Sequence, residues 1–280
     1  MDACRLGTLM RFKDMTEERL RFLKSIGLDC LQAAGLKDEF LTPEGEARAE
    51  QLLEMCSNAG LPAVSLFISF GELNLGAEEH SGIGFAPAAT RGIRGIMACR
   101  EVLWAVRHNI RQFICHAGPI PEHAQADREA FVLTLRELAD FIAAFDGQLL
   151  LESGQESVEQ TRFLLEKIDR SNVGINFDPA NLLYYNTADP RTFWNNFHDR
   201  IRAIHCKDAC RPAPECQSGR ETPLGCGETG FKNLLNDILA SGFNGNLIIE
   251  RELPPSPEQE ADIASAVQLI QNITKQYGTK

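Results

Sequence analysis

Four short apolar runs in the C-terminal half of the chain each stop at a residue that can bind a metal ion. They are residues 148–152, 173–178, 201–205 and 246–250, and they end at Glu152, Asp178, His205 and Glu250. A short run rich in Ile, Leu and Val is typical of a strand buried on both faces. A carboxylate or imidazole at the last position of such a run cannot be buried in the same apolar core. We therefore expect four parallel strands that present these side chains to one common point, as in a metal site at the mouth of a barrel.

Predicted strands and helices alternate along the whole chain, with no linker or break in composition. The expected strands before these runs are 4–9, 28–33, 62–70 and 111–115, and the expected helices are 16–26, 42–59, 90–107, 122–145, 157–168, 189–197, 231–240 and 256–276. Such alternation implies a parallel sheet. Eight units in 280 residues fit a closed (β/α)8 TIM barrel, an α/β fold, better than an open sheet. We expect residues 1–280 to form a single domain.

The charge and cysteine content narrow the class of protein. The net charge is −11, and the acidic residues are spread along the chain, which argues against nucleic acid or an anionic membrane as a partner. No apolar run approaches the roughly 20 residues that span a bilayer, and no signal peptide is evident. Nine scattered cysteines without a Cys-x-x-Cys pair fit a reducing compartment. We therefore expect a cytoplasmic protein that binds a small molecule.

The four strand endings suit one divalent metal ion. In (β/α)8 barrels the active site lies at the C-terminal ends of the strands, and neighbouring strands are about 4.8 Å apart. Four adjacent strand ends can therefore converge on one ion. Three carboxylates and one imidazole favour a fairly hard ion, with Mn²⁺ as the first expectation and Zn²⁺, Co²⁺ or Mg²⁺ as alternatives.

Several motifs around these endings add a specific resemblance. The segments 177–182 (Phe-Asp-Pro-Ala-Asn-Leu), 205–208 (His-Cys-Lys-Asp), 225–228 (Gly-Cys-Gly-Glu) and 248–250 (Ile-Ile-Glu) resemble the sugar phosphate isomerase/epimerase family of xylose isomerase-like barrels. The resemblance is strongest between Leu149 and Glu250. It implies that Glu152, Asp178, His205 and Glu250 are the metal ligands, and that the two glutamates act on the substrate as acid and base.

The expected chemistry is proton transfer beside a carbonyl group. A metal ion that polarises a hydroxyketone makes the neighbouring C–H more acidic and stabilises an enediolate. One carboxylate removes the proton and a carboxylate returns it, and Glu152 and Glu250 are the candidates for these roles. Return to the opposite face gives epimerisation, whereas return to the adjacent carbon gives isomerisation of an aldose and a ketose.

Four further residues are candidates for substrate binding. The resemblance implies a pocket position for His116, and it puts Arg211 where some relatives hold a substrate hydroxyl, although an ordinary loop arginine fits equally well. Lys207 either attracts a substrate anion or pairs with Asp208. Asn181 replaces the histidine that several relatives carry, so a neutral hydrogen-bonding group stands there.

Other polar and aromatic residues near the strands are weaker candidates. Glu156 and Glu159 are expected to be solvated charges at the start of a helix. Phe67 and Phe70 are expected to pack in the core, with a place in the sugar pocket as the alternative.

Competing functions use the same barrel. An endonuclease of this fold needs a histidine at position 181 and an Asp-x-His pair, both absent here, and the six histidines of the chain cannot fill its three-metal site. A keto-inositol dehydratase uses the same metal and base to begin an elimination, and remains an alternative, as does a non-catalytic sugar-binding barrel. The motifs leave open whether the sugar is phosphorylated. The resemblance also implies a homo-oligomer, either a dimer or a tetramer.

Overall fold

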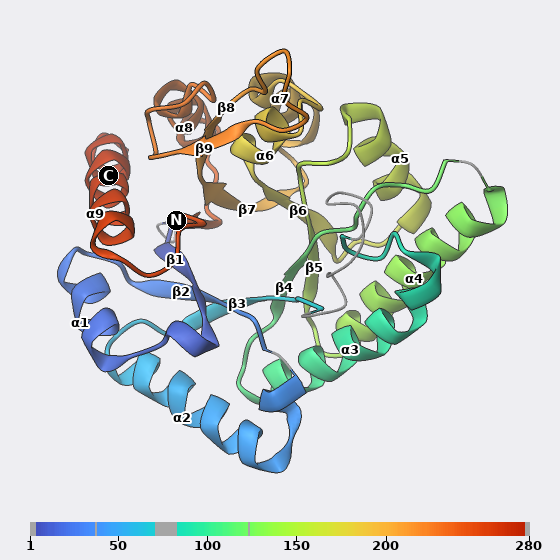
Figure 1. Ribbon diagram of the computed structural model, residues 1–280, viewed down its shortest axis with the longest axis horizontal. Helices are drawn as coiled ribbons and strands as arrows, with labels where there is room; N and C mark the ends of the chain where they lie inside the picture. The colour runs from blue at the N-terminus through green and yellow to red at the C-terminus, as the bar shows by residue number, and fades with distance from the viewer. Residues whose placement is uncertain (1–3, 37, 71–82, 123, 278–280) are drawn as a thin grey trace.

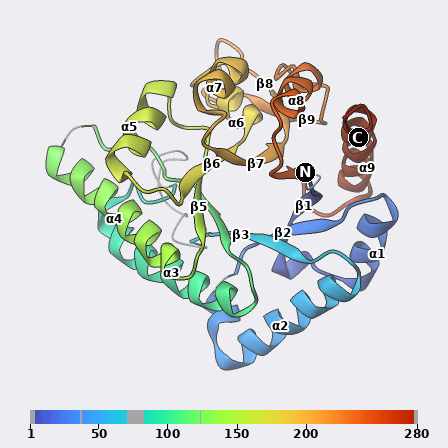
Figure 2. The same cartoon turned by 180° about the vertical axis from the view of Figure 1, so that it is seen from behind.

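The computed structural model describes residues 4–36, 38–70, 83–122 and 124–277. Eight parallel strands form a closed barrel in the order β1-β10-β7-β6-β5-β4-β3-β2, as Figure 1 and, from behind, Figure 2 show. Their bounds are β1 Leu6–Arg11, β2 Cys30–Ala34, β3 Ala63–Phe67, β4 Gln112–Cys115, β5 Gln148–Glu152, β6 Val173–Phe177, β7 Ile201–Cys206 and β10 Asn246–Ile249. The predicted single-domain (β/α)8 barrel is confirmed.

Helices surround the barrel and cover its outer wall (Figure 1). Their bounds are α1 Glu17–Ser25, α2 Pro43–Asn58, α3 Ala88–Arg107, α4 Gln125–Ala143, α5 Val158–Ile168, α6 Pro179–Tyr184, α7 Pro190–Phe197, α8 Phe231–Ala240 and α9 Pro257–Thr274, with short 3-10 helices η1 Phe12–Asp14 and η2 Asp38–Leu41. Thr16 and Thr42 cap α1 and α2 by accepting from the backbone N–H three residues on. None of the helices in the described ranges is long and apolar enough to cross a membrane.

The alternation of side chains along the strands divides the apolar residues into two groups. Ile114, Leu150 and Ala203 form a small buried cluster with Phe67, separate from the large core. The alternate residues, such as Leu149 and Leu151, pack in the large core with residues of the helices. The small cluster therefore fills the inside of the barrel. Because side chains alternate with a period of two, the residues two positions after Leu150 and Ala203 also face inward.

The segment 207–229 lies outside every predicted strand and helix, but it has regular structure. It contains an antiparallel hairpin of two three-residue strands, β8 Asp208–Cys210 and β9 Arg220–Thr222. The Asp208 carboxylate accepts hydrogen bonds from the backbone N–H groups of Gly225, Gly227 and Thr229 at 2.9, 3.1 and 3.2 Å. A Cβ on Gly227 would lie 2.3 Å from Asp208 Oδ1. The buried carboxylate of Asp208 therefore holds residues 225–229 close to β8.

Candidate metal centre

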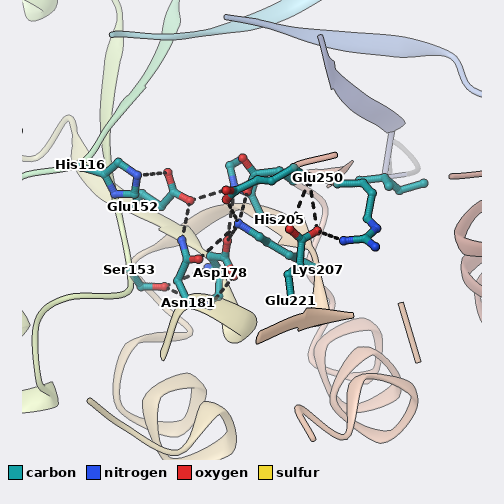
Figure 3. Close-up of polar contacts among 12 residues, drawn as sticks. His116, Glu152, Ser153, Asp178, Asn181, His205, Lys207, Glu221 and Glu250 are labelled. Carbon is teal, nitrogen blue, oxygen red and sulfur yellow. Dashed lines mark hydrogen bonds and ion pairs between the residues drawn. The ribbon is translucent and has the colours of Figure 1, made fainter. Parts of the chain in front are cut away.

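Glu152, Asp178, His205 and Glu250 meet at the C-terminal mouth of the barrel (Figure 3). They come from β5, from the residue after β6, from β7 and from the residue after β10, which are consecutive strands of the barrel. One ligand atom from each side chain lies within 4.8 Å of those of the other three. The side chains of Asp178 and His205 are fully buried, and that of Glu250 is 13% exposed.

The cluster has the ligand atoms expected of a metal site, and some of its carboxylate oxygens have no hydrogen-bond donor. His205 Nδ1 lies 3.1 Å from Glu152 Oε1, 3.2 Å from Glu250 Oε2 and 3.7 Å from Asp178 Oδ2. Glu152 Oε2 and Asp178 Oδ2 are buried without a hydrogen-bond donor. Such oxygens are costly to bury unless a donor or a cation satisfies them. The residues therefore fit one divalent ion held by three carboxylates and an imidazole.

Two polar residues that the sequence analysis did not select orient the imidazole. His205 Nε2 lies 2.8 Å from Gln32 Oε1 on β2, and Gln32 Nε2 donates to Ser65 Oγ on β3 at 3.1 Å. If the amide accepts from His205 Nε2–H, the lone pair of Nδ1 faces the carboxylates, as metal ligation requires. The sequence signal that could have identified Gln32 and Ser65 is a polar residue within each of two otherwise apolar strands.

Gln32→Leu is expected to weaken divalent metal binding about 10- to 100-fold, because loss of the outer hydrogen bond frees the imidazole to rotate and changes its tautomer. Isothermal titration with Mn²⁺ measures the effect. Ser65→Ala is the matched control and should lower the affinity less, since Gln32 keeps its contact with His205. Unchanged affinity in Gln32→Leu would show that this amide does not position the ligand.

Lys207 lies against the cluster rather than against Asp208. Its Nζ is 3.1 Å from Glu250 Oε2 and 3.7 Å from Asp178 Oδ2, and it also pairs with Glu252. The sequence-based alternative of a salt bridge with Asp208 is wrong, because the backbone N–H groups of residues 225–229 surround that carboxylate. Although burial favours the neutral amine, the carboxylates of Glu250, Asp178 and Glu252 outweigh it and raise the pKa of Lys207 well above its usual value.

Asn181 and His116 flank Glu152 on the other side of the cluster (Figure 3). Asn181 Nδ2 donates to Glu152 Oε1 at 3.1 Å, and its Oδ1 accepts from Lys207 Nζ at 3.3 Å. His116 Nε2 lies 3.6 Å from Glu152 Oε2. The Phe67 ring, which was expected only in the core, is stacked 6.2 Å from the His205 ring and lies edge-on 5.5 Å from His116. Phe67 therefore separates the inner core from the polar site.

Arg211 is not brought to the cluster. Its side chain is exposed, and Nη1 donates to Asn186 Oδ1 at 3.0 Å. The cavity beside the cluster has a volume of about 400 Å³ and does not include Arg211 among its lining residues. That cavity is lined by Ala180, Asn181, Tyr184, Tyr185, Lys207, Ala209, Glu221 and Glu252. Asn181 and Lys207 were predicted to bind substrate, whereas the other lining residues from α6, the hairpin and the segment after β10 were not.

The two glutamates of the cluster are held in the ionised form. Burial opposes ionisation of Glu250, but Lys207 and His205 together bring the pKa of this carboxyl well below its usual range. Burial likewise opposes ionisation of Glu152, and the imidazoles of His116 and His205 outweigh it and lower the pKa. Burial dominates at Asp178, where it raises the pKa to about 6. Glu152 and Glu250 are thus carboxylates at neutral pH.

Glu156 was expected to be a solvated charge, and this prediction is wrong. It is 5% exposed, whereas Glu159 is exposed as expected. Burial raises the pKa of Glu156 to about 8, and the nearby charge of Glu152 adds to the increase. The start of α5 packs against the barrel wall here, so a position that looks like an exposed helix start in the sequence is covered in the fold.

The Glu156 carboxyl makes stability depend on pH. Its pKa in the folded protein, about 8, exceeds the ordinary 4.5, so the folded state binds more protons than the unfolded state between these values. Stability is therefore lost as the pH rises through this window. Glu156→Gln is expected to stabilise the protein by roughly 2–4 kcal/mol at pH 8 and little at pH 4.5. Urea unfolding of both proteins at several pH values measures this, and a difference independent of pH would contradict it.

Comparison with known proteins places the chain in a family. A family model described as "Xylose isomerase-like TIM barrel" matches residues 20–273. The chain belongs to this family. A xylose isomerase domain protein from Planctomyces limnophilus is 26% identical with a TM-score of 0.86, and the match covers 100% of this chain and 99% of that chain. Membership of the xylose isomerase-like family confirms the resemblance predicted from the motifs.

Other similar proteins differ in what their names state. A xylose isomerase-like TIM barrel protein from Mycobacterium smegmatis, in complex with magnesium, is 16% identical (TM-score 0.74; 99% of this chain, 100% of that chain). A D-tagatose 3-epimerase-like protein is 15% identical (TM-score 0.73; 98% of each chain). An inosose dehydratase from Lacticaseibacillus casei is 28% identical over 116 residues, which are 37% of this chain and 39% of that protein.

Proposed function

We propose that this protein is a metal-dependent isomerase or epimerase of a keto sugar, which transfers a proton next to a carbonyl group through an enediolate. The observation that carries the proposal is the convergence of two ionised glutamates, Glu152 and Glu250, with Asp178 and His205 at one point. The names of similar proteins include an epimerase-like barrel and a dehydratase, which supports chemistry beside a carbonyl.

A divalent ion held by the four side chains, with Mn²⁺ as the favoured ion, supplies Lewis acidity that makes the C–H beside a carbonyl easier to deprotonate. Glu152 is ionised at neutral pH, so its carboxylate can accept that proton. Glu250 is the second acid/base group, and Lys207 holds its carboxylate in place at 3.1 Å. Asn181 and His116 lie against Glu152, and Asn181 and Lys207 also line the cavity. All three are proposed to bind substrate hydroxyls.

The cavity favours an uncharged sugar over a sugar phosphate. Lys207 is the one cation among its lining residues in the described part of the chain, and Glu250, Asp178 and Glu252 already neutralise it. Glu221 and Glu252 add negative charge to the same wall. A phosphate placed there would meet like charge without a free cation, which costs free energy in a partly buried site. Neutral hydroxyl groups can instead bond with the carboxylates and tyrosines.

A dehydratase acting on a cyclic keto polyol is the second candidate, favoured by the similarity to an inosose dehydratase. Removal of the proton beside the carbonyl is the shared first step. The two reactions differ in the next step, because the dehydratase expels the hydroxyl on the next carbon as water. An isomerase or epimerase instead returns the proton to carbon.

Incubation with Mn²⁺ and a panel of ketoses, keto-inositols and their phosphate esters in D₂O tests these assignments by NMR. Deuterium is expected to enter at the carbon beside the carbonyl of an unphosphorylated ketose, without loss of water. Loss of water would identify the dehydratase. Exchange with phosphate esters alone would contradict the charge argument, and no exchange with any compound would reject the enzyme in favour of a sugar-binding barrel.

A further inference from the structure

Glu221 is a carboxylate in the wall of the cavity that takes no part in the metal cluster. It lies on strand β9 of the hairpin and lines the cavity beside the cluster. Figure 3 shows it on the same side of the cluster as Lys207. Its side chain is only 16% exposed, so it is largely removed from bulk water. A carboxylate in such a position is costly unless donors satisfy its oxygens.

Contacts within the chain fix the Glu221 carboxylate but leave part of it available. Arg251 Nη1 lies 2.9 Å from Glu221 Oε1, and Arg251 is itself held by Asp262, whose Oδ2 accepts from Nε at 2.8 Å. The backbone N–H of Glu252 donates to Oε1 at 3.2 Å and to Oε2 at 3.3 Å. Each carboxylate oxygen can accept about two hydrogen bonds. Oε2 therefore keeps an acceptor position for a donor in the cavity.

The chain also sets the separation between Glu221 and the metal cluster. Glu252, whose N–H contacts Glu221, comes two residues after Glu250 of the cluster, and two residues of chain span at most about 7 Å. Lys207 pairs with the carboxylates of both Glu250 and Glu252. A substrate with its carbonyl at the cluster therefore reaches Glu221 only with hydroxyl groups that are several bonds away from that carbonyl.

Two tyrosines of α6 form another part of the same wall. Tyr184 and Tyr185 line the cavity, and their ring centroids are 5.1 Å apart. The hairpin packs directly against this helix, because Gly219 N donates to Tyr184 O at 2.8 Å and a Cβ on Gly219 would lie 3.0 Å from Tyr184 Cα. Aromatic rings offer apolar surface to the C–H groups of a sugar, and the carboxylate accepts from its hydroxyl groups. This wall therefore has both kinds of surface that a sugar chain presents.

We propose that Glu221 is a specificity-determining residue that binds the substrate hydroxyl groups farthest from the metal ion, and that the substrate is a ketose of five or six carbons rather than a short hydroxyketone. The inference rests on the proposed function, because it places the carbonyl of the substrate at the metal cluster. A hydrogen bond from a hydroxyl group to an ionised carboxylate is stronger than one between neutral groups. Because Arg251 and Glu252 already fix this carboxylate, little side-chain entropy is lost when a sugar binds.

Deuterium exchange with ketones of different length tests the proposal. The probes are the four D-ketohexoses and dihydroxyacetone, which has three carbons, each with Mn²⁺ in D₂O. Glu221→Ala is expected to lower kcat/KM for the best ketohexose by about 10- to 100-fold, mainly through KM, and for dihydroxyacetone by less than about threefold, since only the longer chain reaches this carboxylate. Glu215→Ala removes an exposed glutamate of the same hairpin, outside the cavity, and is the matched control that should change neither value.

Bound Mn²⁺ and melting temperature show whether Glu221→Ala keeps its fold. Glu221→Gln, which retains an oxygen for Arg251, replaces it if alanine disturbs either, and should show a smaller loss with the same selectivity for the ketohexose.

The outcomes separate this inference from the proposed reaction. An equal loss with both kinds of ketone, or no loss with either, would overturn the role of Glu221 and leave the reaction in place. No exchange by the unmodified protein with any of these ketones would reject the reaction. Titration calorimetry with the ketohexoses would then decide the role of Glu221, since equal affinity of the unmodified protein and Glu221→Ala would overturn it and weaker affinity of the variant would support it.

Discussion

Glu250→Gln is expected to lower the turnover of the keto sugar by about 1,000-fold or more, which is within the usual contribution of a general acid–base group. Glutamine has nearly the shape of glutamate but cannot exchange a proton at neutral pH. The change also leaves Lys207, which is 4% exposed, without the carboxylate at 3.1 Å. Glu152→Gln is expected to have an effect of similar size, because it removes the other ionised glutamate of the cluster.

A second carboxylate on the same lysine provides the matched control. Glu252 also pairs with Lys207, but its side chain is 57% exposed and it is not part of the metal cluster. Glu252→Gln should therefore lower turnover far less than Glu250→Gln. Assays at saturating Mn²⁺, with bound metal measured in each variant, separate loss of the base from loss of the ion. Turnover of Glu250→Gln within tenfold of the unmodified protein would reject its role as acid or base.

Isotope exchange distinguishes the two glutamates. If each carboxylate serves one face of the enediolate, each variant should lose deuterium exchange with one epimer and keep it with the other. Loss of exchange with both epimers in both variants, with metal still bound, would instead indicate that the two groups act together on one proton.

Removal of the metal ion is expected to abolish activity and to lower the melting temperature. Free ion at 100 times its dissociation constant stabilises a protein by about 2.7 kcal/mol, which corresponds to about 5 °C or more for a chain of this size. The physical cause is the cluster itself, in which three carboxylates lie within 4.8 Å of one another and two of their oxygens have no donor. Melting curves with chelator and then with Mn²⁺, Mg²⁺, Co²⁺ or Zn²⁺ measure the effect and rank the ions.

Asp178→Asn provides a control with little change in shape. Asp178 caps α6 by accepting from Asn181 N–H at 2.9 Å, and asparagine is an equally good cap. The variant should therefore fold but lose most of the metal-dependent increase in melting temperature. The same increase in Asp178→Asn as in the unmodified protein would show that the ion binds elsewhere.

The burial of particular polar residues was not predictable from the chain. Glu156 and Glu159 look alike in the sequence, yet one is buried and the other exposed, because the barrel wall covers only one side of the start of α5. Gln32 is 173 residues away from the imidazole that it orients. Lys207 precedes Asp208 but pairs with residues after β10. In each case, the partner comes from an element distant in the chain, and local propensity contains no information on it.

The sequence by itself determined the eight strand–helix units and the four residues at strand ends that form the candidate metal cluster. Hydrophobic period, helix caps and strand endings are local properties, and the parallel barrel brings consecutive strand ends to one mouth. Only the tertiary structure decided which oxygens of the cluster lack donors and what surrounds Lys207. These features depend on distances between elements that are far apart in the chain. Tertiary packing sets those distances, and the local sequence of each element contains no information on them.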